Sequence, residues 1–237
     1  MKMLAIESSG MTASVAVATK ECLIGEYTTN YKKTHSQTLL PMIDELLRFI
    51  NMDKKEIDII AVSSGPGSFT GLRIGSATAK GIAMALNIPI VTVPTLEAMA
   101  YNFEGYTGVI CPMMDARRSR VYAGIYEFID GKLVELYPQD VDEVDVIIDK
   151  LNELGKQVIL SGDGSGVYKD CFIEKLNIPY TFAPFQKRDQ SAASVAACAF
   201  NMYEKGQVDT AKSHKPIYLR PSQAEMEKME RESGVNK

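Results

Sequence analysis

The most informative stretch of the chain is Ser63-Ser64-Gly65-Pro66-Gly67-Ser68-Phe69-Thr70-Gly71-Leu72-Arg73-Ile74-Gly75. It continues an apolar run at residues 57–63, which is typical of a strand buried on both faces. Pro66 and the glycines favour a sharp turn, and Ser68 or Thr70 can cap a helix that follows it. The stretch therefore predicts a buried strand, a Gly-rich loop and a helix over residues 71–86.

Small residues form two rows on this predicted helix. The rows consist of Gly71, Gly75, Ala79 and Ala83, and of Ala77, Gly81 and Ala85. A glycine inside a helix costs about 1 kcal/mol relative to alanine, and in exchange it allows a neighbour to approach closely. We expect one row to face the protein's own sheet and the other to receive a partner helix. Tight internal packing on both sides is the alternative.

The rest of the chain shows the same order of elements twice. Periodicity in the first half predicts βββαβαβα at residues 2–7, 13–18, 23–29, 36–50, 57–63, 71–86, 89–93 and 95–102. The corresponding segments of the second half are 109–115, 121–128, 133–137, 141–154, 157–160, 167–176, 179–182 and 192–204. Asp130-Gly131 predicts a hairpin turn, and a second Gly-rich loop occupies residues 161–166.

This duplicated βββαβαβα lobe resembles the actin/hexokinase/sugar-kinase (ASKHA) superfamily, an α/β fold whose two lobes hold a nucleotide between them. We expect an N-terminal lobe at residues 1–104 and a C-terminal lobe at residues 105–221. A charged tail at residues 222–237 is expected to be frayed or a solvated helix. The length of 237 residues suits two lobes that each bury a core.

The superfamily resemblance implies a nucleotide site where the first hairpin and the Gly-rich turns face the cleft. The candidate residues are Glu7, Ser8, Ser9, Asp115, Gly162, Asp163 and Gly164. Acid and hydroxyl groups can position a metal-bound water, and small residues leave backbone N–H groups free to face phosphate. Ordinary tight turns are the alternative. The sequence has no Gly-x-x-x-x-Gly-Lys-Ser/Thr loop, and Glu7 stands where superfamily kinases carry Asp.

Composition limits the classes of partner. With 26 Lys+Arg against 30 Asp+Glu, the net charge of −4 argues against a chain that grips nucleic acid unaided. No apolar run is long enough for a membrane span, and the apolar start is too short for a signal peptide. Four widely spaced cysteines favour buried or idle thiols over zinc or disulfides: Cys22, Cys111, Cys171 and Cys198. We therefore expect a cytoplasmic protein without membrane contact.

Residues 64–75 resemble the signature of the bacterial TsaB family, also called YeaZ. Three further segments agree with that family: His35-Ser36-Gln37-Thr38-Leu39-Leu40-Pro41, Met114-Asp115-Ala116-Arg117, and Pro216-Ile217-Tyr218-Leu219-Arg220-Pro221. The resemblance extends from residue 4 to about residue 221.

The family resemblance implies a subunit of the machinery that makes threonylcarbamoyladenosine beside the anticodon of tRNAs reading ANN codons. In that machinery the catalytic paralogue TsaD transfers the threonylcarbamoyl group, TsaB pairs with TsaD, and the ATPase TsaE joins them. The resemblance implies no tightly bound cofactor, ATP or ADP only at the level of the complex, and tRNA contact only through the complex. A flat pairing surface also predicts a homodimer when TsaD is absent.

The family's interface helices map here onto residues 35–50 and 71–86. The interface residues implied are His35, Leu39, Ile43, Thr70, Gly71, Arg73, Ile74, Gly75, Thr78, Ala79 and Ile82.

The resemblance to TsaD also supplies a test for catalysis. TsaD carries His-x-x-x-His after the strand that follows its Gly-rich helix, and Thr95 and Met99 occupy those positions here. Thr and Met do not rebuild such a metal site, so we expect neither a metal centre nor catalytic residues. His35 is expected to have a surface or capping role. The alternative is an independent, weakly nucleotide-binding protein or ATPase; the sequence carries no protease motif.

A basic cluster remains. Arg117, Arg118 and Arg120, with Tyr122, occupy a predicted turn beside the cleft and could contact phosphate of a nucleotide or tRNA. A solvated turn that pairs with nearby acids is the alternative. The same two interpretations hold for the basic residues near the C-terminus: Lys212, Lys215 and Arg220.

Overall fold

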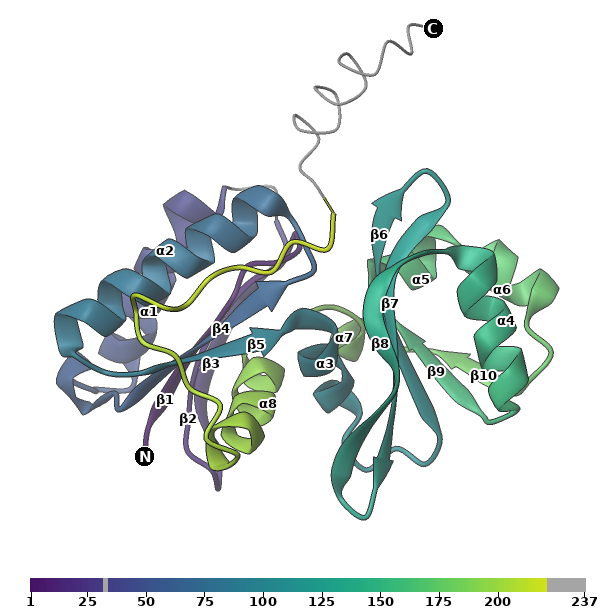
Figure 1. The fold of residues 1–237 in the computed structure, drawn as a ribbon. Coiled ribbons are helices and arrows are strands. Elements are labelled where there is room, and N and C mark those ends of the chain that lie inside the picture. Colours follow the sequence, from purple (N-terminus) through teal and green to yellow (C-terminus); the bar gives the residue numbers. More distant parts are fainter. Residues whose placement is uncertain (32–33, 221–237) are drawn as a thin grey trace, which may run out of the picture.

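The computed structural model describes residues 1–31 and 34–220, so the charged tail expected at residues 222–237 lies outside the described residues. It contains two five-stranded mixed sheets, each the centre of one lobe (Figure 1). Among the described residues, no helix combines the length and apolar character that crossing a membrane requires.

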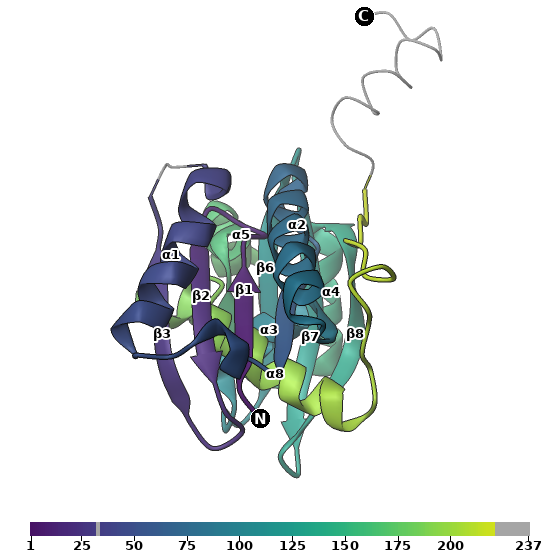
Figure 2. The same ribbon diagram turned by 90° about the vertical axis from the view of Figure 1, so that its left-hand side faces the viewer.

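The first sheet has the strand order β3-β2-β1-β4-β5. Its strands are β1 (Met3–Glu7), β2 (Ala13–Ala18), β3 (Leu23–Thr29), β4 (Ile59–Gly65) and β5 (Ile90–Pro94). One face is covered by α1 (His35–Phe49) and α2 (Phe69–Leu86), which lie side by side in Figure 2. The other face is covered by α8 (Ala192–Glu204). Because both faces are covered, every residue of β1, β2 and β4 is buried, as expected of central strands in such a sheet.

The second sheet has the order β10-β9-β6-β7-β8, which is the same arrangement in reverse. Its strands are β6 (Val109–Arg117), β7 (Arg120–Ile129), β8 (Lys132–Glu143), β9 (Val158–Ser161) and β10 (Tyr180–Phe182). The remaining helices are α3 (Thr95–Ala100), α4 (Val144–Leu154), α5 (Asp163–Val167), α6 (Lys169–Lys175), α7 (Phe185–Arg188) and two short 3₁₀ turns, Lys54–Glu56 and Tyr101–Phe103. The duplicated α/β fold expected from the sequence is confirmed.

The last helix of each half packs on the sheet of the other half. Helix α3 places Leu96 and Met99 against the second sheet, in one apolar cluster with Tyr126. Helix α8, from the second half of the chain, packs Val195 and Ala199 against the first sheet. The two helices also contact each other, so the chain crosses twice between the lobes at this junction.

Three predicted segments differ from the structure. Residues 141–143, expected in a helix, extend β8, because Val141, Asp142 and Glu143 pair with β7. The segment at residues 167–176, expected as one helix, is the end of α5 followed by α6. The second Gly-rich loop, expected at residues 161–166, is helical from Asp163 onward, where α5 begins. In the first case cross-strand pairing overrides the helical pattern.

Residues 209–220, the C-terminal strap, connect the lobes on one side. Asp209 pairs with Ile90 of β5, and the Ile217 amide donates to the Ser64 carbonyl 2.7 Å away. The Arg220 guanidinium then donates to the Ala116 carbonyl of β6 at 2.9 Å. Figure 1 shows the strap in yellow-green, passing over the first lobe and rising toward the gap between the lobes.

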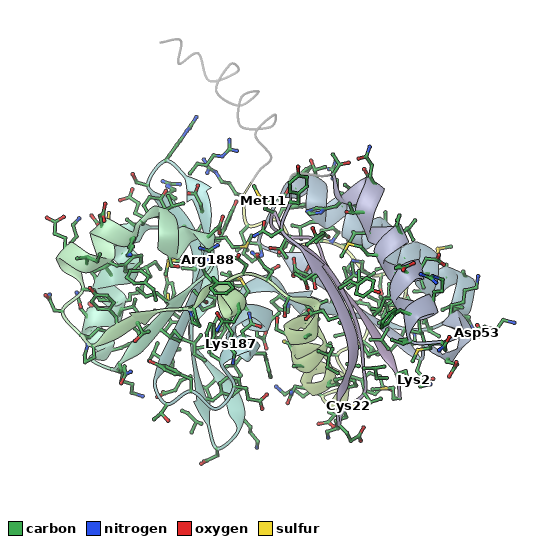
Figure 3. All side chains as sticks on the ribbon, turned by 180° about the vertical axis from the view of Figure 1, so that it is seen from behind. Lys2, Met11, Cys22, Asp53, Lys187 and Arg188 are labelled. Carbon is green, nitrogen blue, oxygen red and sulfur yellow. The ribbon has the colours of Figure 1, made fainter. Side chains whose placement is uncertain are left out.

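On the opposite side the lobes are joined through α7. Figure 3 shows Lys187 and Arg188 at this junction, whereas Cys22, Lys2 and Asp53 lie at the outer parts of the first lobe. The Asn102 amide donates to the Lys187 and Asp189 carbonyls at 3.2 and 3.1 Å.

Candidate functional site

The acid at the end of β1 is sealed inside the first lobe. Glu7 is 1% exposed, and its Oε1 accepts hydrogen bonds from the Ser9 amide at 2.5 Å and the Ser9 hydroxyl at 2.6 Å. Burial raises the pKa of the Glu7 carboxyl above its usual value, and the Ser9 bonds oppose that rise. The side chains expected to meet a nucleotide therefore satisfy one another.

The start of α2 closes over the same loop. The Ser8 hydroxyl donates to the Gly71 carbonyl at 2.9 Å, and Ser8 and Ser9 are fully buried. A Cβ at Gly71 would meet the Ser8 carbonyl, and one at Gly75 would meet the Ser8 hydroxyl. These glycines are thus required for contact between two parts of this chain.

In the second lobe the structure brings Asp115, Gly162, Asp163 and Gly164 together. An Asp163 oxygen accepts from the Asp115 amide at 3.3 Å and the Gly164 amide at 3.0 Å, and partial burial raises the pKa of Asp163. The Gly162 amide donates to the Arg188 carbonyl at 2.8 Å. The Gly162 and Gly164 amides, which could have faced a phosphate, are therefore bonded within the chain.

The Glu7 and Asp115 groups form separate clusters. Within residues 1–31 and 34–220, no hydrogen bond joins the Glu7 group to the Asp115 group. Asp115 instead braces the tip of the second lobe: one carboxylate oxygen accepts from the Arg117 amide at 2.8 Å and the Tyr168 hydroxyl at 3.0 Å.

The two positions that the resemblance to TsaD implies for its histidine pair, Thr95 and Met99, have structural roles. Thr95 is fully buried, and its hydroxyl accepts from the Gly65 amide at 3.2 Å. Met99 lies in the apolar cluster beneath the second sheet. The described part of the chain contains no group of three His, Cys, Asp or Glu side chains arranged to hold a metal ion.

Both histidines have partners within the chain. His35, at the start of α1, donates from Nε2 to the Gly10 carbonyl at 2.9 Å. His214 of the strap is buried, and its Nδ1 lies 2.7 Å from the Thr92 hydroxyl, which also donates to Asp209 at 2.6 Å. Sequence reasoning did not find this Thr92–Asp209–His214 cluster, because more than a hundred residues separate Thr92 from the strap and no local pattern links them.

All four cysteines are free, with Cys111 and Cys198 buried and Cys22 exposed. Burial raises the pKa of the Cys111 thiol to about 12. A thiol held in that state is a poor nucleophile at neutral pH.

Part of the partner interface expected on α1 and α2 is buried within this chain. Five residues expected at a partner interface instead pack in this chain's own core: Leu39, Ile43, Gly71, Gly75 and Ala79. The row that contains Gly71 faces inward because Ser8 and the first sheet lie directly beneath it. In the isolated chain these five residues have little or no exposed surface, and their contact with a partner stays a prediction.

The outer surface of α1 and α2 is apolar in places. Leu40 is 56% exposed, and Phe49 and Met84 are each 71% exposed. The second small row, Ala77, Gly81 and Ala85, is exposed, and a Cβ at Gly81 would have no neighbour within 4 Å. Of the other expected interface residues, Thr70 and Arg73 are exposed, and the half-buried ones are His35, Ile74, Thr78 and Ile82.

The arginine cluster occupies the tip between β6 and β7. Arg117, Arg118 and Ser119 have successive φ values of 62°, 56° and 59°, in the left-handed region. Each such residue costs about 1–2 kcal/mol relative to a right-handed conformation. The Asp115 brace and the β6–β7 pairing hold this turn, so that Arg117, Arg118 and Arg120 are all exposed.

Comparison with known proteins places the chain in a family. Residues 22–230 match the family model of TsaD, tRNA N6-adenosine threonylcarbamoyltransferase. The tRNA threonylcarbamoyladenosine biosynthesis protein TsaB of Bacillus subtilis (strain 168) is 35% identical over 176 residues, which cover 74% of this chain and 77% of that protein.

Solved structures show the same fold. YeaZ from Pseudomonas aeruginosa superposes with a TM-score of 0.76 at 25% identity, covering 92% of this chain and 99% of that one. The ROK hexokinase of Thermus thermophilus, at 11% identity, has a TM-score of 0.51 and coverage of 87% and 100%, which supports the ASKHA fold alone. From its sequence match to the Bacillus protein and the extent of the family model, the chain belongs to the TsaB (YeaZ) family.

Proposed function

We propose that this chain is a non-catalytic subunit in threonylcarbamoyl transfer to the adenosine beside the anticodon of ANN-decoding tRNAs. Membership of the TsaB family places it in tRNA threonylcarbamoyladenosine biosynthesis. The finer proposal is that it pairs with and supports TsaD, that TsaE joins the pair, and that the chain forms a homodimer when TsaD is absent.

The single observation that carries this proposal is the closure of the first lobe. Glu7, Ser8 and Ser9 are buried and bonded to one another or to α2, where an active ASKHA enzyme would meet its nucleotide. Water and substrate cannot reach these groups without opening the contact between the first hairpin and α2. The burial of Glu7, Ser8 and Ser9 therefore supports a structural role for these three residues.

The outer face of α1 and α2 supports pairing. Exposed large apolar side chains on two adjacent helices, together with a flat row of small residues, suit a helical partner. Helix α2 contains no acidic residue and carries Lys80 in its middle, so its partner is expected to present acidic or neutral side chains there.

The test is reconstitution with purified TsaD, TsaE, tRNA transcript, ATP and the threonylcarbamoyl donor. We expect this chain to co-elute with TsaD in size-exclusion chromatography and the modified adenosine to form only when both are present. Modification by TsaD alone at the same rate, or separate elution, would contradict the proposal.

Independent nucleotide binding is the competing function. Calorimetry with ATP and Mg²⁺ on the isolated chain distinguishes the two, because binding that is tight and lost in Glu7→Ala would favour an enzyme. The internal hydrogen bonds of both Gly-rich loops support weak or absent binding instead.

A further inference from the structure

Basic charge is concentrated where three distant segments meet, although the chain as a whole is acidic. The segments are the tip at residues 116–122, helix α2, and the strap after Asp209, and none of them contains Asp or Glu. They are joined by two contacts: the Arg220 guanidinium donates to the Ala116 carbonyl at 2.9 Å, and Arg73 Nε donates to the Tyr218 hydroxyl at 3.3 Å. Arginines from both lobes are thus brought to one region by the strap.

Three of these arginines form what we call the arginine surface: Arg73, Arg117 and Arg120. All three are exposed, and none of the ion pairs among residues 1–31 and 34–220 includes them. Two acids lie close to them in the β6–β8 pairing: Asp115 accepts from the Arg117 amide and the Tyr168 hydroxyl, and Glu143 lies opposite Arg120 in the β7–β8 register. The three guanidinium groups can therefore bind an external anion.

An aromatic pair lies beside the arginine surface. The rings of Phe69 and Tyr218 are 4.4 Å apart with an interplanar angle of 34°, and the Arg73 guanidinium lies 3.9 Å from the Phe69 ring centroid. Tyr218 is 40% exposed, so its ring is accessible from solvent. Aromatic rings interleaved with arginines bind unpaired bases by stacking while the arginines bind phosphates.

We propose that the arginine surface and Tyr218 form an RNA-binding site for a looped or single-stranded segment of the tRNA substrate. The proposal rests on the proposed function, which supplies the RNA, and adds a direct contact by this chain. Arg73, Arg117 and Arg120 bind successive phosphates, and one unstacked base packs on the Tyr218 ring. The low net charge of the chain is compatible with this site, because the contacts come from one basic region rather than from overall charge.

The experiment measures the affinity of fluorescently labelled, unmodified tRNA for the complex with TsaD across a range of salt concentrations. In the Arg117→Ala/Arg120→Ala variant, the slope of log affinity against log salt is expected to shrink by about 0.7 for each lost phosphate contact. Tyr218→Leu is expected to weaken binding about 10-fold with the slope unchanged, because stacking carries no charge, and Tyr218→Trp is expected to restore it.

The matched control is Lys55→Ala, an exposed cation two residues after Asp53, which Figure 3 labels at the outer edge of the first lobe. An unchanged slope in the arginine variant, or an equal loss in the Lys55 variant, would overturn the proposal. Inorganic phosphate is added as a competitor, and if millimolar phosphate displaces the tRNA completely, the site is a simple anion site and not an RNA site. Co-elution with TsaD is recorded for the wild-type chain and for each variant. Failed pairing of the wild-type chain counts against the proposed function. Normal pairing of the arginine variant with an unchanged salt slope counts against this inference alone.

Discussion

The Ser8 hydroxyl donates a hydrogen bond to the Gly71 carbonyl 2.9 Å away, across 63 residues of sequence. This contact joins the first hairpin to the first turn of α2 and seals Glu7 beneath them. It also explains why α2 begins with glycines at positions 71 and 75, where any side chain would collide with Ser8. Stability of the first lobe and burial of Glu7 are therefore properties of the same contact.

Gly75→Ala is expected to destabilise the chain by about 1–3 kcal/mol, although alanine favours helices, because its methyl group meets the Ser8 hydroxyl. Gly81→Ala, on the open side of the same helix, is expected to stabilise by up to about 1 kcal/mol. Urea unfolding monitored by circular dichroism measures both. In the Ser8→Ala background the cost of Gly75→Ala should fall, and a cost that stays unchanged would show that another contact is responsible.

The buried Glu7 carboxyl makes stability depend on pH. Its folded-state pKa lies above the usual 4.5, so the folded chain holds this proton more tightly than the unfolded chain. The stability of wild type relative to Glu7→Gln should be greatest below pH 4.5 and decline as pH rises through the folded pKa. Urea titrations of both proteins from pH 4 upward check the direction of this change. The contributions of the other titratable groups cancel when the two unfolding free energies are subtracted. A difference that grows with pH would mean that the ionised form is the one the fold prefers.

Gly81→Arg is expected to block pairing with TsaD without harming the fold. The residue is exposed with open space around it, and arginine has the higher helix propensity. Gly166→Arg is the matched control, since Gly166 is an exposed helical glycine of α5 with equal space in the second lobe. Size-exclusion chromatography and calorimetry with TsaD compare them. Equal affinity of the two variants would remove the outer row of α2 from the interface. Ala79→Arg is unsuitable as a test of pairing, because Ala79 is fully buried and an arginine at this position would unfold the first lobe.

Thr92→Val is expected to cost about 1–3 kcal/mol and to loosen the strap. The Thr92 hydroxyl donates to Asp209 and accepts from His214, and both partners would lose a partly buried hydrogen bond. Thr181→Val, at an exposed position of β10, should change stability by less than about 0.5 kcal/mol. Urea unfolding gives the energy, and limited proteolysis reports cleavage near residue 214. If the strap is cleaved no faster than in wild type, the Thr92 cluster does not anchor it.

Local sequence predicted most elements within a few residues. The bounds expected for β2, β3 and α8 agree with the structure, since alternation or a helical apolar stripe is a short-range signal. The end of β8 was missed because pairing with β7 decides it. The crossing of α3 and α8 between the lobes was missed for a related reason. Periodicity identifies the residues that share a helix face, but it does not say which sheet that face will meet.

For the candidate site, too, some features follow from the sequence and others only from the tertiary structure. By itself the sequence determined the family, the duplicated order of elements and the two small rows on α2. Only the tertiary structure decided which small row faces inward, that Glu7 is sealed, and that Arg73, Tyr218, Arg117 and Arg120 lie in one region. The physical reason is that residue type and spacing are local properties. Burial and proximity depend on contacts between segments that are 63 to 145 residues apart in the sequence.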